Sequence, residues 1–230
     1  MRIGLAGVVV MAAVLLLLLV LAQVLLPGIA ASRVRERVQP YGHVRSVSVS
    51  AFPAVKLLWG DADSVSVSAV SLSATPAQIG SLLWEARSLD ELRLSAQTAV
   101  LRPSQLPAGL TLSDVHLRKR ASSLSATAIL TQEQLEAALP SGFSVEPFAA
   151  SGGAVEAHAS GALFGVQASV TVAIRAVEGD LIAEPQGLPF AGLARVTLFS
   201  DPHLKVGGVS LRISGSGPRV YSLYVWASLV

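Results

Sequence analysis

The 230-residue chain has no cysteine and no asparagine, and only 14% of its residues are charged. The lack of cysteine excludes disulfide bonds and thiolate metal sites. Its 17 basic and 15 acidic residues are spread along the chain and give a formal net charge of +2. A nucleic-acid interface needs a clustered basic face, so we expect no nucleic-acid partner. Apolar residues, by contrast, make up 52% of the chain.

The chain begins with an apolar segment, which runs without a charge from Ile3 to Leu26. This segment is long enough to span a bilayer and exceeds the apolar core of a typical signal peptide. It predicts an uncleaved signal-anchor over residues 1–26, with signal cleavage before Ser32 as the alternative. We therefore expect a single-pass cell-membrane protein. Residues 27–40 would form a juxtamembrane helix or linker, and residues 41–230 an extracytoplasmic domain.

From Val44 onward apolar and polar residues alternate, which is the period of β-strands with one buried face. Examples are "VRSVSVSA", "SVSVSAVSLSA", "LTLSDVHLRK" and "RVYSLYVWASLV". Two further segments, Thr75–Leu83 and Thr131–Leu139, share the pattern T-x-x-Q-[IL]-x-x-x-L. This pattern predicts two amphipathic helices that each begin with a capping box. Strands with two helices indicate an α+β domain.

No recognisable catalytic or metal-binding motif is present. The four histidines are far apart in the sequence: His43, His116, His158 and His203. None lies in a metal-ligand spacing, and the serines form no G-x-S-x-G nucleophile motif. We therefore expect a protein that is not an enzyme and needs no metal or other cofactor. A hydrolase assembled from scattered residues is the alternative.

Three apolar clusters interrupt the alternation: "FPAVKLLWG" (Phe52–Gly60), "GFSVEPF" (Gly142–Phe148) and "GALFGVQA" (Gly161–Ala168). A strand buries only every second side chain on one face, so adjacent apolar residues need another explanation. They are either part of an ordinary core or the lip or wall of an apolar cavity.

In their order, these segments resemble the actinobacterial LmeA-like family of cell-envelope phospholipid-binding proteins. The resemblance runs from Leu26 to about Phe190 and rests on "LPGIA", "FPAVKLLWG", "VSVSAVSL", "LTQEQLEAAL" and "GDLIAEPQGLPF". It implies a strongly curled antiparallel α+β sheet with helices packed inside it, like tubular lipid-binding proteins. An immunoglobulin-like β-sandwich is the alternative fold. The chain is less charged than several relatives, which leaves its headgroup specificity open.

The resemblance also implies that the chain binds a phospholipid or related envelope lipid, for lipid transfer or envelope maintenance. The candidate lipid-binding residues are Phe52, Pro53, Val55, Leu57, Leu58, Trp59, Leu83, Phe143, Phe148, Leu163 and Phe164, with Leu163 and Phe164 as the wall opposite the first cluster. Arg45 or Arg175 would pair with the headgroup phosphate. A structural or scaffolding envelope protein is the alternative function, with a protein partner bound at a strand edge or apolar patch.

Overall fold

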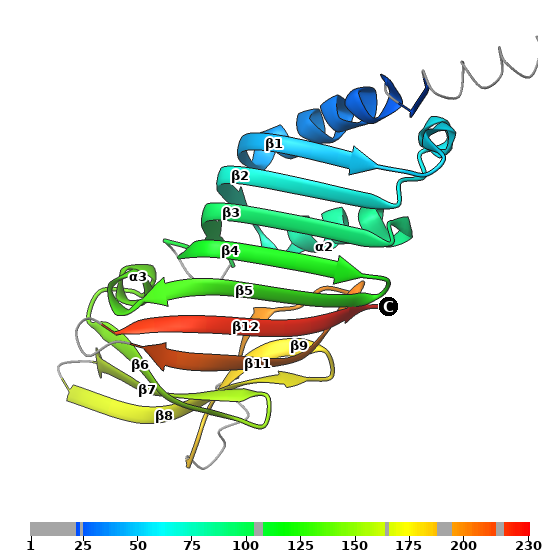
Figure 1. Ribbon diagram of the computed structural model, residues 1–230. Helices are drawn as coiled ribbons and strands as arrows, with labels where there is room; N and C mark the ends of the chain where they lie inside the picture. Colours follow the sequence, from blue (N-terminus) through cyan, green and yellow to red (C-terminus); the bar gives the residue numbers. More distant parts are fainter. Residues whose placement is uncertain (1–21, 24, 104–107, 164–165, 188–194, 215–218) are drawn as a thin grey trace, which may run out of the picture.

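A computed structural model describes residues 22–23, 25–103, 108–163, 166–187, 195–214 and 219–230 (Figure 1). Strands dominate this part of the chain and form two sheets. The larger sheet has seven strands in the order β1 (Gly42–Ser50), β2 (Ser64–Ala74), β3 (Glu91–Leu101), β4 (Leu110–Arg120), β5 (Ser123–Thr131), β12 (Val220–Leu229) and β11 (Leu204–Ser214). The smaller sheet has five in the order β10 (Val196–Phe199), β9 (Asp180–Pro185), β8 (Val166–Val177), β7 (Ala154–Leu163) and β6 (Phe143–Ser151).

Both predicted helices are confirmed, and both begin with the predicted capping box. In α2 (Pro76–Glu85) the Gln78 N–H donates to Thr75 Oγ1 at 3.3 Å, and Gln78 Oε1 accepts from the Thr75 N–H at 2.8 Å. In α3 (Gln132–Ala138) Thr131 and Gln134 make the same pair of hydrogen bonds. Each box satisfies two backbone donors that a helix N-terminus leaves free.

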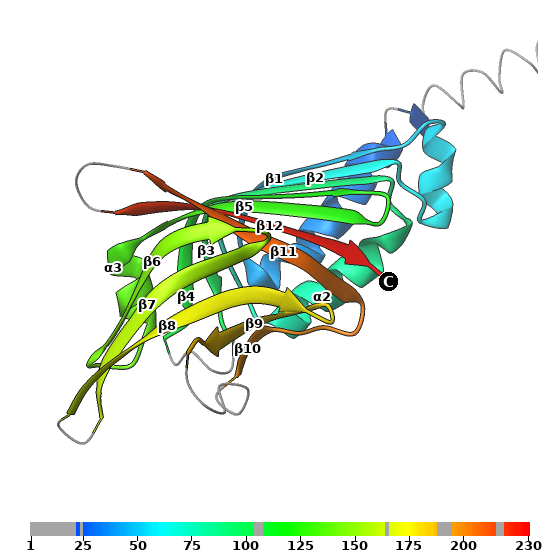
Figure 2. The same ribbon diagram turned by 90° about the horizontal axis from the view of Figure 1, so that it is seen from below.

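The helices lie against one face of the larger sheet (Figure 2). A helix over residues 25–38 packs Val34 and Val38 against the buried strand residues Val49, Val65 and Val67. A second core cluster joins α2 to the sheet through Leu83, Leu124 and Leu204. The short 3₁₀ helices are η1 (Gln39–Tyr41), η2 (Ala54–Trp59) and η3 (Ala86–Ser88).

The predicted single, strongly curled antiparallel sheet with helices packed inside it is wrong. The strands form two open sheets, and β2 and β3 pair in parallel. The physical reason is the helix between them: α2 returns the chain to the end of the sheet where β2 began, so β3 must run in the same direction. An antiparallel immunoglobulin-like sandwich has no such helical crossover, so the alternative fold prediction is also wrong.

The predicted single-pass membrane anchor is also corrected. Among the described residues, no helix is long and apolar enough to cross a membrane. Residues 1–21, which make up most of the predicted segment, lie outside the described residues. The predicted juxtamembrane helix falls on residues 25–38, and its side chains Ala30, Ala31, Val34 and Val38 pack against a core cluster of the domain.

Candidate functional site

The two faces of the larger sheet differ in chemistry along rows of paired residues. One row crosses all seven strands with apolar side chains only: Val47, Val67, Leu94, Leu117, Ala126, Val225 and Val209. The neighbouring row is polar or aromatic: Ser46, Ser68, Ser95, His116, Thr127, Tyr224 and Ser210. Because side chains alternate across a strand, the sheet has an apolar inner face, partly covered by helices, and a hydroxyl-rich outer face.

The smaller sheet also has one apolar face. Its paired rows there are Val145–Ala159–Val170, Pro147–Ala157–Val172–Pro185 and Val155–Ile174–Ala183. The opposite face carries the charged side chains of Glu146, Glu156, Arg175 and Glu184. On the apolar face Val155 and Ala157 are 2% and 0% exposed, and we therefore assign this face as the one turned to the larger sheet.

The smaller sheet meets the larger one at β11 and then crosses beneath its inner face (Figure 2). The Val209 N–H donates to Gly153 O at 3.1 Å, and the Val206 N–H donates to Gly179 O at 2.7 Å. Both acceptors lie in turns of the smaller sheet, so its hairpin ends hydrogen-bond to the free edge of β11. At the far end, Phe199 of β10 packs into the core cluster of Leu83.

An aromatic side chain packs at this contact between the two sheets, which we call the joint. The Trp226 indole lies over the bare backbone of Gly207 and Gly208, and a Cβ on Gly208 would be 2.3 Å from Trp226 Cζ2. A Cβ on Gly153, in the turn of the smaller sheet, would be 3.3 Å from the same indole atom. Glycine is required at Gly208 because any side chain there would overlap the ring.

At the other end, α3 bridges the two sheets. The buried Tyr221 hydroxyl of β12 donates to Gln132 Oε1 at 2.6 Å, and Gln132 Nε2 donates to Val145 O of β6 at 3.0 Å. These bonds satisfy a hydroxyl that is fully shielded from water. Thus α2 and α3 lie at opposite ends of the region between the sheets.

Some of the apolar side chains on these two faces are only half-buried, while others, such as Ala96, Ala128 and Ala157, are buried. We define the inner surface as Leu94, Leu117, Ala126 and Val225 of the larger sheet with Val145, Val170, Val172 and Ile174 of the smaller sheet, all of intermediate exposure. Residues in a close-packed protein core lose nearly all contact with solvent. In the same row Val67 of β2 and Val209 of β11 are 5% and 4% exposed, while Val47 at the β1 end is half-buried. The middle of the row therefore retains accessible apolar area.

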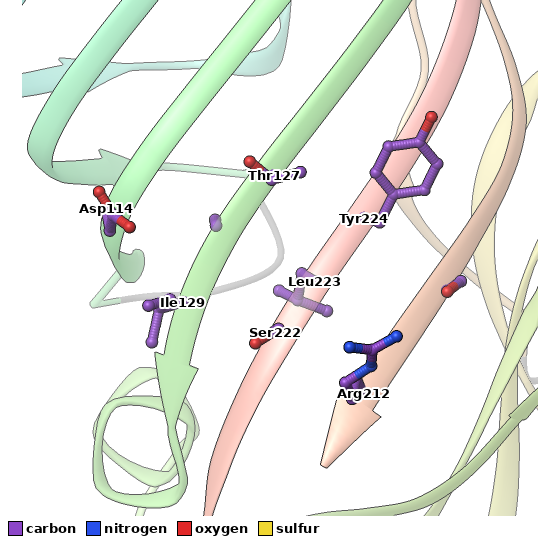
Figure 3. A pocket seen from close by; sticks show the side chains of 9 residues that line it. Asp114, Thr127, Ile129, Arg212, Ser222, Leu223 and Tyr224 are labelled. Carbon is purple, nitrogen blue, oxygen red and sulfur yellow. The ribbon is translucent and has the colours of Figure 1, made fainter. Parts of the chain in front are cut away.

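The outer face carries polar hollows. One of about 480 Å³ lies over β5, β12 and β11, with Asp114, Thr127, Arg212, Ser222 and Tyr224 among its lining residues (Figure 3). A second of about 770 Å³ lies over β1 to β5 and is lined mainly by serines and arginines. Both hollows have charged side chains among their lining residues, Asp114 and Arg212 in the first and Arg93 and Arg118 in the second, and these side chains are poor partners for acyl chains.

The first predicted cluster lies at the exposed end of the β1–β2 hairpin. Phe52, Leu58 and Trp59 are 75%, 64% and 74% exposed. Pro53 and Val55 are half-buried in the same loop, as is Leu57, which packs on the core cluster of Val49.

The other predicted lipid-binding residues are scattered. Leu83 is a core residue of α2, while Phe143 and Phe148 are partly exposed on β6, with Phe148 stacked on His158 at 4.2 Å. Leu163 ends β7, and Phe164 lies outside the described residues.

The structure does not bring η2 and β7 together as opposing walls of one cavity. The η2 helix belongs to the β1 edge of the larger sheet, whereas β7 contacts its β11 edge. Six strand spacings separate these edges, about 29 Å.

The two predicted headgroup residues differ in their surroundings. Arg45 is exposed on the edge strand β1. Arg175 donates to Glu184 at 2.7 Å on the charged face of the smaller sheet, where Arg195 also approaches the same carboxylate at 3.6 Å. The charge of Arg175 is therefore already compensated, and its side chain is on the face opposite the inner surface.

Two carboxylates and one amine have shifted pKa values. The Arg118 hydrogen bond at 2.8 Å, with Arg93 beside it, lowers the pKa of Glu91. The Arg175 hydrogen bond, with Arg195 nearby, likewise lowers the pKa of Glu184. Lys119 is fully buried and donates from Nζ to the Arg87 and Leu89 carbonyls; burial lowers the pKa of this amine.

We expect the folded domain to become less stable at acidic pH, because protonation of Glu184 removes its ion pair with Arg175. Its pKa is lower in the folded state than the ordinary value of 4.5, so its stabilising effect is present above about pH 4.5 and is lost as pH falls. Glu184→Gln should lower the thermal midpoint at neutral pH and weaken its fall between about pH 5 and pH 3. Glu156→Gln, at an exposed position on β7, is the control. Equal pH profiles for wild type and Glu184→Gln would contradict the assignment.

Sequence reasoning missed the inner surface. Leu94, Ala126 and Val225 occupy ordinary alternating positions, and the pattern marks them only as one face of a strand. Their half-burial depends on how the smaller sheet crosses the larger one. The uninterrupted alternation of "SATAIL" and "SLYVWASL" is the only signal they leave in the sequence.

Comparison with known proteins agrees with an apolar ligand. The model of a family described as LmeA-like phospholipid-binding matches residues 21–214. No curated protein and no solved structure matched the chain. The matched residues take in every strand from β1 to β11, which is the whole smaller sheet and all of the larger sheet except β12. With the match covering most of its length, the chain belongs to the LmeA-like phospholipid-binding family.

Proposed function

We propose that the chain binds the acyl chains of a phospholipid, or of a related envelope lipid, against the inner surface. The observation that carries this proposal is the half-burial of the eight apolar side chains that make up the inner surface. Water against such surfaces is unfavourable, and an acyl chain that replaces it gains about 0.8 kcal/mol per buried methylene. Binding of this kind needs no covalent chemistry and no cofactor.

The charged groups favour a headgroup that stays outside this region. Lys119, two residues along β4 from Leu117 on the same face, is buried and already donates to the Arg87 and Leu89 carbonyls. The eight side chains of the inner surface carry no charge, so a phosphate among them would be buried without a partner. The polar end of the lipid would therefore remain at an open side between the sheets, in contact with water. Transfer of lipid between membranes is compatible with this arrangement, because a ligand held by apolar contacts alone can leave without breaking ion pairs.

Lipid extraction tests the proposal. The full chain is purified in a single detergent whose molecular mass is distinct from that of phospholipids. The purified protein is then extracted with organic solvent, and the extracted lipids are identified by mass spectrometry. We expect about one phospholipid per chain, and lipid-stripped protein should take up added phospholipid with a rise in thermal midpoint, because a ligand that binds only the folded state stabilises it. If purified protein carries no lipid and added phospholipid leaves the midpoint unchanged, the proposal is wrong.

A further inference from the structure

A group of exposed apolar side chains lies at one end of the molecule, away from the inner surface. Phe52, Leu58 and Trp59 are 75%, 64% and 74% exposed, and all belong to the short segment around η2. We call these three residues the apolar tip. A large exposed aromatic is costly in water, and several together mark a binding surface.

The apolar tip is held in place by polar contacts rather than by packing of its own side chains. The Phe52 N–H donates to Asp63 Oδ2 at 2.6 Å, and the Ala54 N–H donates to Gln23 Oε1 at 2.9 Å. Lys56 pairs with Asp63 at 3.3 Å. These bonds fix the backbone on both sides of Phe52, so the loop presents its apolar side chains without folding them back onto the domain.

The N-terminal segment next to the tip loop in space is also apolar. Gln23, which caps the tip loop, follows a stretch that carries no charged side chain from Ile3 to Ala22. Leu25, two residues further on, is 60% exposed at the start of the helix over residues 25–38 (Figure 1). One end of the molecule thus combines the exposed tip with the entry of this uncharged segment.

The charges around the tip nearly balance. Lys56 is neutralised by Asp63, and Asp61 is an exposed acid beside the loop. A surface without net positive charge has no electrostatic preference for anionic partners. Trp and Phe beside a leucine are the side chains that favour the boundary between lipid headgroups and acyl chains.

We propose that the apolar tip inserts into the interfacial zone of a phospholipid bilayer and docks the domain on a membrane surface. The site is separate from the inner surface, and docking does not require that an acyl chain is bound there. Insertion depends on apolar contact, so it occurs on zwitterionic as well as anionic bilayers and changes little with salt.

Fluorescence quenching by brominated lipid tests this insertion directly. The full chain is mixed with phosphatidylcholine vesicles whose acyl chains carry bromine, and tryptophan emission is recorded. We expect quenching that Trp59→Phe largely abolishes while Trp84→Phe leaves it in place, because Trp59 is the tryptophan of the inserted tip. The N-terminal segment contains no tryptophan. Vesicle binding without quenching in wild type, or quenching that Trp59→Phe leaves unchanged, would therefore overturn the proposal.

Sedimentation with unbrominated vesicles gives the matching affinity test. Leu58→Ser should weaken partition into phosphatidylcholine vesicles by about tenfold, the effect of losing one buried apolar side chain. Ile213→Ser is the control, since Ile213 is an exposed apolar residue (41%) on β11, at the opposite edge of the sheet. If both variants and wild type partition equally into the vesicles, the apolar tip does not bind the bilayer and the proposal is wrong.

The same samples separate docking from lipid occupancy. Leu58→Ser should carry as much extracted phospholipid as wild type, because the inner surface is untouched. If Leu58→Ser loses vesicle binding but keeps a normal lipid content, the result supports membrane docking by the apolar tip and leaves the inner surface untested. If lipid is absent from wild type while Trp59 is still quenched, the proposed function fails and the docking tip stands. Binding of a purified protein partner by the tip, with no quenching on vesicles, would overturn the proposal in favour of a protein interface.

Discussion

Replacing Gly208 with valine is expected to destabilise the domain by about 3 kcal/mol, the upper range for overpacking. A Cβ at this position would lie 2.3 Å from Trp226 Cζ2, and the indole is a rigid ring that cannot bend away. Moving it would also disturb Gly153, whose carbonyl accepts the Val209 N–H. The joint between the two sheets is therefore what valine disrupts. Denaturant unfolding followed by far-UV circular dichroism measures the loss.

Two further variants identify the cause of this loss. Ser210→Val adds the same side chain two residues along, on the same face of β11, and should change stability by less than about 0.5 kcal/mol. Trp226→Ala should cost up to about 3 kcal/mol, because it removes the half-buried indole that packs on Gly207 and Gly208. If the indole is the obstacle, the Gly208→Val and Trp226→Ala double variant loses less than the sum of the two single losses. Strict additivity would show that valine acts elsewhere.

Replacing Ala126 with tryptophan is expected to weaken lipid binding by more than about tenfold. Ala126 lies in the middle of the inner surface, between Leu117 of β4 and Val225 of β12. An indole there displaces at least two methylene groups of an acyl chain, about 1.6 kcal/mol at 0.8 kcal/mol each. Lipid content after extraction, normalised to protein, measures the effect.

Thr127→Trp is the matched control for this substitution. Thr127 is the next residue on β5, but its side chain is on the outer face, where it lines a polar hollow (Figure 3). We expect normal lipid content for Thr127→Trp and a stable, lipid-poor protein for Ala126→Trp. An ordinary close-packed core would respond differently: Ala126→Trp would then unfold the domain by overpacking, and no lipid would be found in wild type either. That pair of results would reject the inner surface as a lipid site.

The amino-acid sequence by itself determined the local elements of this protein. The capping boxes of Thr75 and Thr131 each involve partners three residues apart, so the helix starts follow from neighbouring residues alone. Alternation likewise assigns each strand residue to one of two faces, because a period of two is a property of the extended backbone. Residues such as Ser95 and Leu94 were thus separable before any pairing was known.

Tertiary structure alone decided what those faces meet. The parallel pairing of β2 with β3, and the separation of β6 to β10 into a second sheet, depend on contacts between residues far apart in the chain. Adjacent apolar residues such as Leu58 and Trp59 are equally compatible with a core and with an exposed tip, and only the surrounding packing distinguishes the two. The half-burial of Ala126 and Val225 has the same origin, because it depends on how the smaller sheet crosses the larger one, and local periodicity carries no information about that crossing.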